Sequence, residues 1–370
     1  MVDMRHDVFT DRIERVRQQL EFSGLDAVCL SVGADMPYLI GYEAMPLERL
    51  TMLVVDRSDT PTLFIPELET ARVTPVDGVF EMVGWGETTD PISLVAARLG
   101  ARTKVAMGDT MWARFVVDLL GARPDLQLHR SSTVMTPLRA VKDAAEIDAL
   151  RTAAHAADRV VGQLQSGAVP LVGRTEAEVA ADLSARLIDE GHDVVNFAIV
   201  ATAENAASPH HHPGDRAIEA GDLLLTDIGG TYAGYCSDIT RCVSIGEPSA
   251  EVVEAYAVLH EAQRAGVAAG AQGGTCQDVD RAARRVIDDA GYGDYFIHRT
   301  GHGIGMEAHE DPYMVEGNDE PLVAGHAFSV EPGIYVAGAY GMRLEDIVVA
   351  GVDGPDQLNQ SNHDLVVVPG

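Results

Sequence analysis

The sequence predicts an α+β protein in which a small α/β domain precedes a larger domain whose strands are interrupted by pairs of helices. In the first part of the chain, short apolar stretches alternate with amphipathic helical patterns. In the second part the helices come in pairs, without strict βαβ alternation. A chain of 370 residues also exceeds the roughly 250 to 300 residues that one hydrophobic core supports. We therefore expect two domains, residues 1–136 and 137–370.

The expected first domain begins with an amphipathic helix over residues 1–20. Its apolar side chains recur at helical spacing, and Gly24 is placed to end the helix. The apolar stretches that follow are rich in β-branched residues, which favours strands, and two later stretches have helical periodicity. Strands are expected at 25–32, 50–55 and 62–65, and helices at 92–99 and 111–120.

The second domain is expected to start where TPLRAVKDAAE, residues 136–146, places a proline before a charged helix start. A long helix should follow directly, since apolar residues then recur at helical spacing. Further helices are expected at 176–190, 251–268 and 279–290, and strands at 194–200 and 223–228.

Two segments of this second domain repeat one pattern. GDLLLTD, ending at Asp227, and GHAFSVE, ending at Glu331, each place a carboxylate six residues after a glycine, at the end of an apolar strand. Asp238 follows 11 residues after the first acid, and Glu345 follows 14 residues after the second. Each unit therefore predicts a hairpin with one acid per strand, and the two hairpins together predict an approximate two-fold symmetry axis. Four clustered carboxylates require a cation, because like charges in contact cannot all ionise.

The composition argues against several classes of function. The 27 basic and 57 acidic residues give a net charge of −30, which disfavours partners with phosphate backbones or anionic membrane surfaces. Four cysteines without a CxxC pair indicate a reducing cytoplasm rather than a disulfide framework. No run of about 18 apolar residues predicts a membrane span. We therefore expect a cytoplasmic protein that binds neither nucleic acid nor membranes.

A histidine motif accompanies the acids. RTGHGIG, residues 299–305, sets His302 between glycines, which permit close backbone approach, and His309 follows seven residues later. An imidazole among carboxylates shifts the metal preference toward Mn, Fe, Co or Zn and away from Ca or Mg.

Taken together, these motifs resemble the dinuclear metallopeptidases of the aminopeptidase P, prolidase and methionine aminopeptidase superfamily, of M24 type. The N-terminal half resembles the creatinase-type N-terminal domain, and the chain as a whole is most similar to bacterial Xaa-Pro dipeptidases. The resemblance implies a pita-bread catalytic domain, whose internal two-fold matches the repeat described above. The segments that carry it are DIGGTYAGYCSDITR (227–241), GHGIGMEAHE (301–310), SVEPGIY (329–335), MRLED (342–346), MPYLIGYE (36–43) and ERLTMLVV (48–55).

The resemblance implies two divalent metal ions per subunit. Asp227 would bind one ion, His302 and Glu331 the other, and Asp238 and Glu345 would bridge both. Mn is the first expectation, with Co, Zn or Fe as alternatives. A hydroxide bridging the two ions would then attack the peptide bond.

The resemblance also assigns catalytic and supporting residues. Glu331 would relay the proton of the water, and His309 would donate to the oxyanion. His210, in SPHHHPGD, matches a pocket histidine that engages the substrate carbonyl or carboxylate, whereas we interpret His211 and His212 as a solvated loop. Tyr335 and Arg343 match residues that steady the first aspartate. Together with Tyr313, they are expected to bind the substrate or to support the metal ligands.

The implied activity is hydrolysis of Xaa-Pro bonds, most directly in dipeptides, by a homodimer. One departure concerns Tyr313, which stands where some prolidases carry an arginine for the substrate carboxylate. Either His210 or Arg343 binds that carboxylate instead, or the enzyme accepts longer peptides.

Three alternatives stay open at this stage: an aminopeptidase P acting on longer Xaa-Pro peptides, a non-peptide amidohydrolase on the same scaffold, and an inactive binding module. The sequence also leaves open the physiological metal, the residue preferred before proline, the oligomeric state and the reason for the strong acidity.

Overall fold

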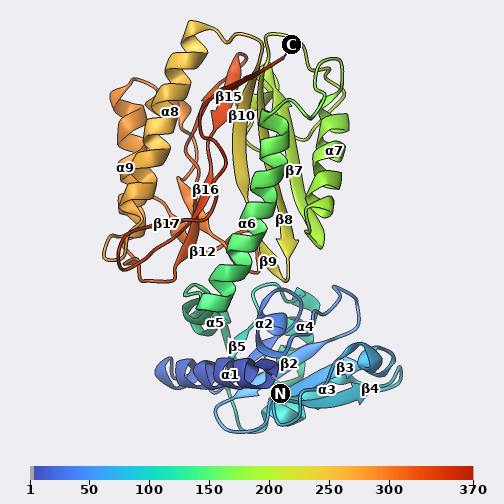
Figure 1. Cartoon of the computed structure of the whole chain (residues 1–370). Coiled ribbons are helices and arrows are strands. Elements are labelled where there is room, and N and C mark those ends of the chain that lie inside the picture. The colour runs from blue at the N-terminus through green and yellow to red at the C-terminus, as the bar shows by residue number, and fades with distance from the viewer. Residues whose placement is uncertain (1–3, 370) are drawn as a thin grey trace. The chain divides into compact units, whose positions relative to one another are not determined.

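The computed structural model describes residues 4–369, so residues 1–3 of the expected first helix lie outside it. The chain divides into two compact units, Met1–Arg139 and Ala140–Gly370 (Figure 1). The division expected after residue 136 falls inside a helix, Ser132–Arg139, that continues through Pro137.

The N-terminal unit is built on one mixed six-stranded sheet with the order β4-β3-β2-β1-β5-β6. Helices α3 and α4 cover one face, where their apolar side chains pack against those of the strands. The elements are α1 (Met4–Phe22), β1 (Ala27–Leu30), α2 (Asp35–Ile40), β2 (Met52–Asp56), β3 (Thr62–Pro66), the 3₁₀ turn η1 (Glu67–Arg72), β4 (Glu81–Trp85), α3 (Pro91–Leu99), β5 (Lys104–Met107), α4 (Ala113–Ala122), β6 (Gln127–Arg130) and α5 (Ser132–Arg139).

The helical periodicity of the first segment is confirmed by burial. Phe9, Ile13, Val16 and Leu20 form the buried face of α1, and Gly24 follows the helix with a positive φ of 67°. This left-handed conformation is the reason a glycine suits the position.

The C-terminal unit contains two five-stranded sheets, β18-β10-β8-β7 with β9 beside β8, and β12-β11-β13-β16-β17, together with the hairpin β14-β15. Its first elements are α6 (Ala144–Gln165), α7 (Glu176–Asp189), β7 (Val194–Thr202), η2 (Ala203–Ala207), β8 (Leu223–Tyr232), β9 (Tyr235–Cys236) and β10 (Ile239–Ile245). The remaining elements are α8 (Ala250–Ala269), α9 (Cys276–Asp289), η3 (Gly293–Tyr295), β11 (Gly301–Gly303), β12 (Glu310–Met314), β13 (Ala327–Val330), β14 (Gly333–Val336), β15 (Tyr340–Arg343), β16 (Asp346–Val349), β17 (Asp356–Gln357) and β18 (Val366–Val368).

This unit repeats one order of elements. Helices α6 and α7 pack on the first sheet, and Cys276 and Val279 of α9 pack against strands of the second. The second helix of each pair has 14 residues and starts with a capping box, at Thr175 and at Thr275. The same local chemistry thus begins the equivalent helix twice, which supports the predicted internal repeat.

Both predicted acidic hairpins are present. Strand β8 pairs antiparallel with β10, with Asp227 opposite Thr240, and Asp238 directly precedes β10. Strand β13 pairs antiparallel with β16, so that Glu331 directly follows one strand and Glu345 directly precedes the other. One expectation is corrected, because Asp227 lies within β8 rather than at its end: the strand continues to Tyr232 through pairing with β7.

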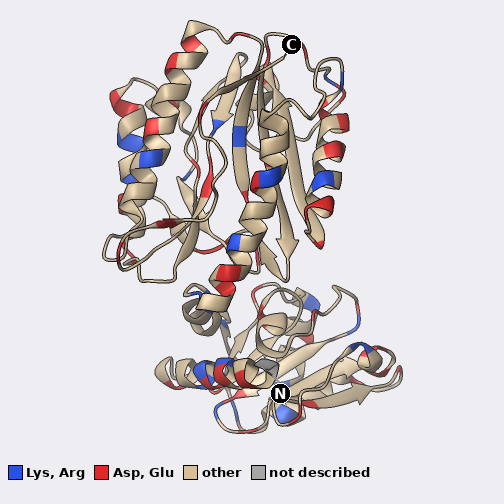
Figure 2. Cartoon of the chain, viewed as in Figure 1, with Lys and Arg blue, Asp and Glu red and all other residues tan. Residues whose placement is uncertain are grey.

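Charged side chains are concentrated on the helices of the C-terminal unit, while most strand surface carries none (Figure 2). Of the four hairpin acids, Asp227 lies within a strand, and Asp238, Glu331 and Glu345 directly flank strands. In residues 4–369, none of the helices has the length and apolar character needed to cross a bilayer.

Candidate metal centre and substrate pocket

A cavity of about 650 Å³ in the C-terminal unit collects the predicted site residues. Its walls include both hairpins, the loop after η2 and the strand that carries His302. The lining residues are Phe197, Ile199, Ser208, Pro209, His210, Asp227, Asp238, Ile297, His298, Arg299, His302, His309, Glu331, Arg343 and Glu345. The structure thus brings together all five expected metal ligands and both expected pocket histidines.

Close backbone packing positions His302. A Cβ atom at Gly301 would overlap the carbonyl oxygen of Ser329, and one at Gly303 would overlap that of Asp311. The backbone N–H of His302 donates to the Ser329 hydroxyl at 3.0 Å. The glycines therefore allow β11 to lie against its neighbours, as the sequence predicted, and this fixes the imidazole in the cavity wall.

The hydrogen bonds of His302 define its tautomer. Nδ1 lies 3.1 Å from the carbonyl oxygen of Gly303, which can only accept, so Nδ1 carries the proton. Burial, then the neighbouring His309, lowers the pKa of His302 to about 3, which makes the ring neutral at pH 7. The lone pair of Nε2 then faces two carboxylates, 3.3 Å from Glu331 Oε1 and 3.8 Å from Asp238 Oδ2. A lone pair facing carboxylate oxygens is repulsive unless a proton or a metal cation lies between them.

The acids of the cluster repel one another. Burial, and then the charges of Glu345, Asp227 and Glu331, raise the pKa of Asp238 well above its usual value. Burial followed by the charges of Glu331 and Asp227 does the same for the pKa of Glu345. Burial also raises the pKa of Glu331 to about 7, against the opposing effect of Arg343. The cationic side chains of the protein therefore do not balance the negative charge of this cluster.

Asp227 supplies a further indication of a missing partner. Its Oδ2 accepts a hydrogen bond from Arg343 Nη2, whereas its Oδ1 is buried without a hydrogen-bond partner among the described residues. An unsatisfied buried oxygen is costly, and a hard cation is a partner that would satisfy it.

The ligand atoms fall into three overlapping groups, each with its atoms within 4.8 Å of one another. The groups are Asp227–Asp238–Glu345, His302–Glu331–Glu345 and Asp238–His302–His309. Oxygen ligands with one or two imidazoles are typical of Mn, Fe, Co or Zn sites. The described side chains thus fit divalent metal ions by donor type, by spacing and by their unbalanced charge.

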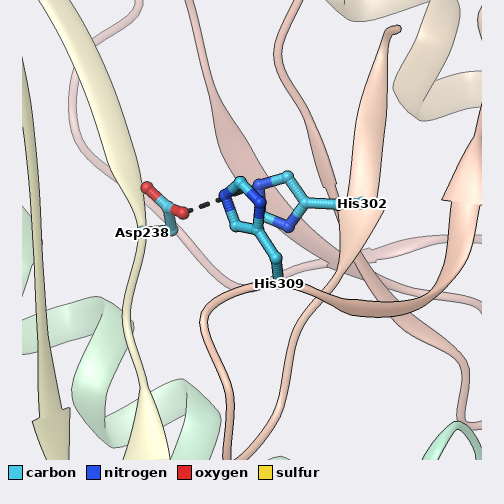
Figure 3. A group of neighbouring side chains, drawn as sticks. All are labelled: Asp238, His302 and His309. Atoms are coloured by element: carbon cyan, nitrogen blue, oxygen red, sulfur yellow. Dashed lines mark ion pairs between the residues drawn. The ribbon is translucent and has the colours of Figure 1, made fainter. Parts of the chain in front are cut away.

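His309 lies over His302. Their ring centroids are 3.8 Å apart at an interplanar angle of 26°, and Figure 3 shows both imidazoles directed toward Asp238. His309 is the more exposed of the two. Burial, then the charge of Arg299, lowers the pKa of His309, so that the neutral ring can donate a hydrogen bond into the cavity.

His210 stands at the exposed edge of the cavity, on a loop that the structure anchors at one buried carboxylate. Glu176, at the start of α7, accepts from the backbone N–H groups of Thr202 and Gly214 and lies 2.7 Å from His211 Nε2. The interpretation of His211 as a solvated loop residue is therefore wrong, whereas His212 is exposed as expected. Glu176 was missed because its partners lie 26 to 38 residues away in sequence.

Arg343 is surrounded by acceptors. Besides Asp227, it donates from Nε to the Thr240 hydroxyl at 3.0 Å and from Nη1 to the Tyr335 hydroxyl at 2.9 Å. The Tyr335 hydroxyl also lies 2.9 Å from His298 Nε2. The structure thus places Arg343 and Tyr335 beside the first aspartate, where the sequence expected them.

Three hydroxyl and imidazole groups of this network were not singled out from the sequence. Thr240 donates to Glu345 Oε2 at 2.7 Å, and Ser329 donates to Glu331 Oε1 at 3.2 Å. His298 joins through Tyr335. Thr240 lies two residues after Asp238, and Ser329 lies two residues before Glu331. In extended chain, side chains two residues apart face the same side. That spacing could have identified Thr240 and Ser329.

Comparisons with known proteins agree with this geometry. Residues 148–351 match the model of metallopeptidase family M24, and residues 12–141 match that of the creatinase/prolidase N-terminal domain. The chain is 43% identical, over 98% of its length and 97% of the relative, to a probable dipeptidase PepE from Mycobacterium bovis. It is 35% identical, over 96% of its length and 99% of the relative, to an Xaa-Pro dipeptidase from Lactobacillus delbrueckii subsp. lactis.

Solved structures show the same fold. The crystal structure of dipeptidase PepE from Mycobacterium ulcerans superposes with a TM-score of 0.94 at 44% identity, covering 99% of both chains. That of a prolidase from Thermococcus sibiricus superposes with a TM-score of 0.92 at 35% identity, covering 97% of this chain and 99% of the other. The predicted architecture, a creatinase-type N-terminal domain followed by a pita-bread domain, is confirmed. The chain belongs to metallopeptidase family M24 and is a peptidase.

Proposed function

We propose that this peptidase hydrolyses Xaa-Pro bonds, chiefly in dipeptides, with two divalent metal ions, Mn in the first place. The observation that carries the proposal is the buried cluster of four carboxylates around the neutral His302, inside a cavity of about 650 Å³. Relatives named Xaa-Pro dipeptidase and prolidase support the choice of substrate.

The overlap of the ligand groups supports the division of roles expected from the sequence. Asp238, Glu345 and His302 each belong to two of the three groups, but only Asp238 and Glu345 also share a group with Asp227, as residues that hold both ions would. Asp227 occurs only in the group with both of these acids, and Glu331 only in the group with His302 and Glu345. We assign Asp227 to one ion, His302 and Glu331 to the other, and Asp238 and Glu345 to both.

When bound, such ions supply Lewis-acid activation of water and of the scissile carbonyl. The chain's own residues then handle the protons. A carboxylate oxygen of Glu331 takes a proton from the attacking water and delivers it to the prolyl nitrogen as the C–N bond breaks. His309 donates a hydrogen bond to the carbonyl oxygen as negative charge develops there, and His210 holds the substrate from the cavity edge.

The peptide bond before proline needs such an arrangement. Its nitrogen carries no hydrogen, so the bond offers no N–H for recognition, and the leaving ring nitrogen must be protonated. Apolar side chains of Phe197, Ile199 and Ile297 line the same cavity and offer a surface for a prolyl ring or for the side chain before it.

The proposal includes a cytoplasmic homodimer. A reducing compartment is supported by the four cysteines, all of which are free and buried. Dimerisation rests on the family resemblance alone, and sedimentation of the full chain at several concentrations would test it.

The test of the substrate is hydrolysis of Leu-Pro and Leu-Pro-Pro by protein reloaded with Mn²⁺, with Glu345→Ala as the inactive control. Cleavage of Leu-Pro that the variant lacks supports a prolidase. Cleavage mainly of Leu-Pro-Pro would instead make the protein an aminopeptidase P. If the metal-loaded protein cleaved neither peptide, the proposal of Xaa-Pro hydrolysis would be wrong, and non-peptide amides would be the next substrates to assay.

A further inference from the structure

The cavity contains one cationic side chain without an acidic partner. The guanidinium of Arg299 lies 4.1 Å from the ring centroid of Tyr313, stacked over its face. In the described part of the chain, residues 4–369, no carboxylate lies within ion-pair distance of this guanidinium and no group accepts a hydrogen bond from it. Arg299 nevertheless lines the cavity.

The charge of Arg299 acts on the catalytic groups. It lowers the pKa of His302 and of His309 after the larger effect of burial, and it opposes the burial-induced rise in the pKa of Glu331. Arg299 shares the cavity wall with the five ligand residues and belongs to none of the three ligand groups. Its five N–H donors are a ready binding site for a planar anion.

Other basic groups near the cavity are already engaged. Arg343 donates to Asp227, Thr240 and Tyr335, which uses all three of its nitrogens. Lys142 forms a buried ion pair of 2.6 Å with Glu310. His210 can donate from a ring nitrogen but cannot form the two parallel hydrogen bonds of a guanidinium. This leaves Arg299 as the group suited to bind a carboxylate.

Substrate chemistry places a carboxylate near this position. In a dipeptide ending in proline, the terminal carboxyl carbon is two covalent bonds from the scissile nitrogen, which is about 2.5 Å in space. The group that binds it must therefore share the cavity with the metal cluster. In a longer peptide the same position holds a neutral amide, which offers one oxygen and no charge.

We propose, on the basis of the function proposed above, that Arg299, held over Tyr313, binds the C-terminal carboxylate of an Xaa-Pro dipeptide and makes the enzyme prefer dipeptides. Tyr313 is the platform for this arginine: an aromatic face stabilises a guanidinium without consuming its N–H donors. Tyr313, which stands where some prolidases carry an arginine, thus supports a cation contributed by the segment just before β11.

The test pairs a charged and a neutral substrate with one variant. Full-length protein reloaded with Mn²⁺ is assayed on Leu-Pro and on Leu-Pro amide, which differ only at the terminal carboxylate. Arg299→Gln should lower kcat/KM for Leu-Pro about tenfold to hundredfold, mainly through KM, since a charge-assisted pair is lost. The same variant should change kcat/KM for Leu-Pro amide by less than about threefold.

Arg281→Gln is the matched control. Arg281 lies on the exposed face of α9, paired with Glu316 at 2.6 Å, so its variant removes one positive charge from a residue that does not line the cavity. Arg281→Gln should leave kcat/KM for both substrates unchanged. In a second pair, Tyr313→Ala should raise KM for Leu-Pro about threefold, as expected for a lost cation–π contact, and Tyr313→Phe, which keeps an aromatic face, should raise it less.

Two results would overturn the inference: an equal loss on both substrates in Arg299→Gln, or no loss on Leu-Pro. Metal content and the melting temperature of Arg299→Gln, measured in parallel, identify a loss of activity caused by misfolding. In that case Arg299→Lys, which keeps the positive charge, should still have a higher kcat/KM for Leu-Pro than for Leu-Pro amide. Wild-type protein that binds metal and cleaves neither substrate would reject the proposed function itself, which is a distinct result.

Discussion

Glu345 and Asp346 are neighbours in sequence and are both almost completely buried, yet their electrostatic environments are opposite. Burial would raise the pKa of Asp346, but the Arg241 guanidinium, 2.6 Å away, and His363 more than offset this and lower it to about 2. Burial raises the pKa of Glu345 well above its usual value, and the charges of Glu331 and Asp227 raise it further.

The difference lies in the source of positive charge. Asp346 also accepts from Gln263 at 2.7 Å, so its charge is compensated by side chains of the fold. Glu345 accepts one hydrogen bond, from the Thr240 hydroxyl, and the charges of Glu331 and Asp227 act on it more strongly than the opposing charge of Arg343. One residue therefore stabilises the folded chain by itself, while the other requires a cation from solution. This is how one strand end can serve both structure and catalysis.

Deleting the carboxylate of Glu345 should have the largest effect on activity. Glu345→Ala removes a ligand assigned to both ions, so the loss in kcat/KM should exceed the roughly 10- to 100-fold typical for outer partners of a metal site. Hydrolysis of Leu-Pro and metal content by elemental analysis provide the measurement. Glu316→Ala, which removes an exposed acid, is the control. Near-normal turnover in Glu345→Ala would contradict the assignment.

Removing the neighbouring acid should instead affect stability. Asp346→Ala leaves the guanidinium of Arg241 fully buried without its carboxylate, and breaking such a pair costs about 3–5 kcal/mol. The midpoint of urea unfolding, recorded with a chelator present, measures this.

The contrast with Glu345→Ala is the informative part of that experiment. Without metal, Glu345→Ala should unfold at or above the urea concentration of wild type, because it removes a repelled charge. Arg241→Met combined with Asp346→Leu should recover part of the lost stability, since neither charge is then left unpaired. A loss below about 1 kcal/mol in Asp346→Ala would show that solvent or His363 satisfies the arginine.

The sequence predicts the acids of the two hairpins better than it predicts the ion pairs that compensate buried charge. Helical periodicity located α6 to α9, and the repeated glycine-to-acid spacing located both hairpins and their four acids, because these signals are local. The pairs Arg241–Asp346 and Arg343–Asp227 span 105 and 116 residues, and no local pattern encodes such partners. The anchoring of the His210 loop by Glu176 and the position of Arg299 over Tyr313 were not predicted for the same reason.

Removing the imidazole of His309 should lower turnover without changing metal binding. In His309→Ala the cavity loses a hydrogen-bond donor to the developing oxyanion, and kcat should fall by about 10². Turnover of Leu-Pro and metal content are measured together. The exposed His129 on β6 offers a control, since His129→Ala removes an imidazole from the other unit. A collapse of metal content in His309→Ala would make His309 a ligand, as its place in one of the three groups would then indicate.

The smallest expected effect is the pH dependence of stability without metal. The pKa of Glu331 is raised to about 7, and those of Asp238 and Glu345 are raised well above their usual values. In an unfolded chain these carboxyls titrate near 4. The contribution of Glu331 to stability is therefore fully present below about pH 4 and is lost as pH rises through about 7. The contributions of Asp238 and Glu345 are also present below about pH 4 and are lost as pH rises above their usual range. The contribution of Asp346, with its pKa of about 2, is present above about pH 4 and is lost as pH falls through about 2.

Melting temperatures of chelated protein should therefore decline between pH 5 and pH 8, and the increase on adding Mn²⁺ should be larger at pH 8 than at pH 5. Glu345→Gln should flatten the decline, because one of the repelled charges is absent, whereas Glu316→Gln should leave it unchanged. A melting temperature of the chelated wild type that rises over this range would mean that the four acids are compensated by the fold. In that case Glu345 would resemble Asp346, and the cluster would be a structural network rather than a metal centre.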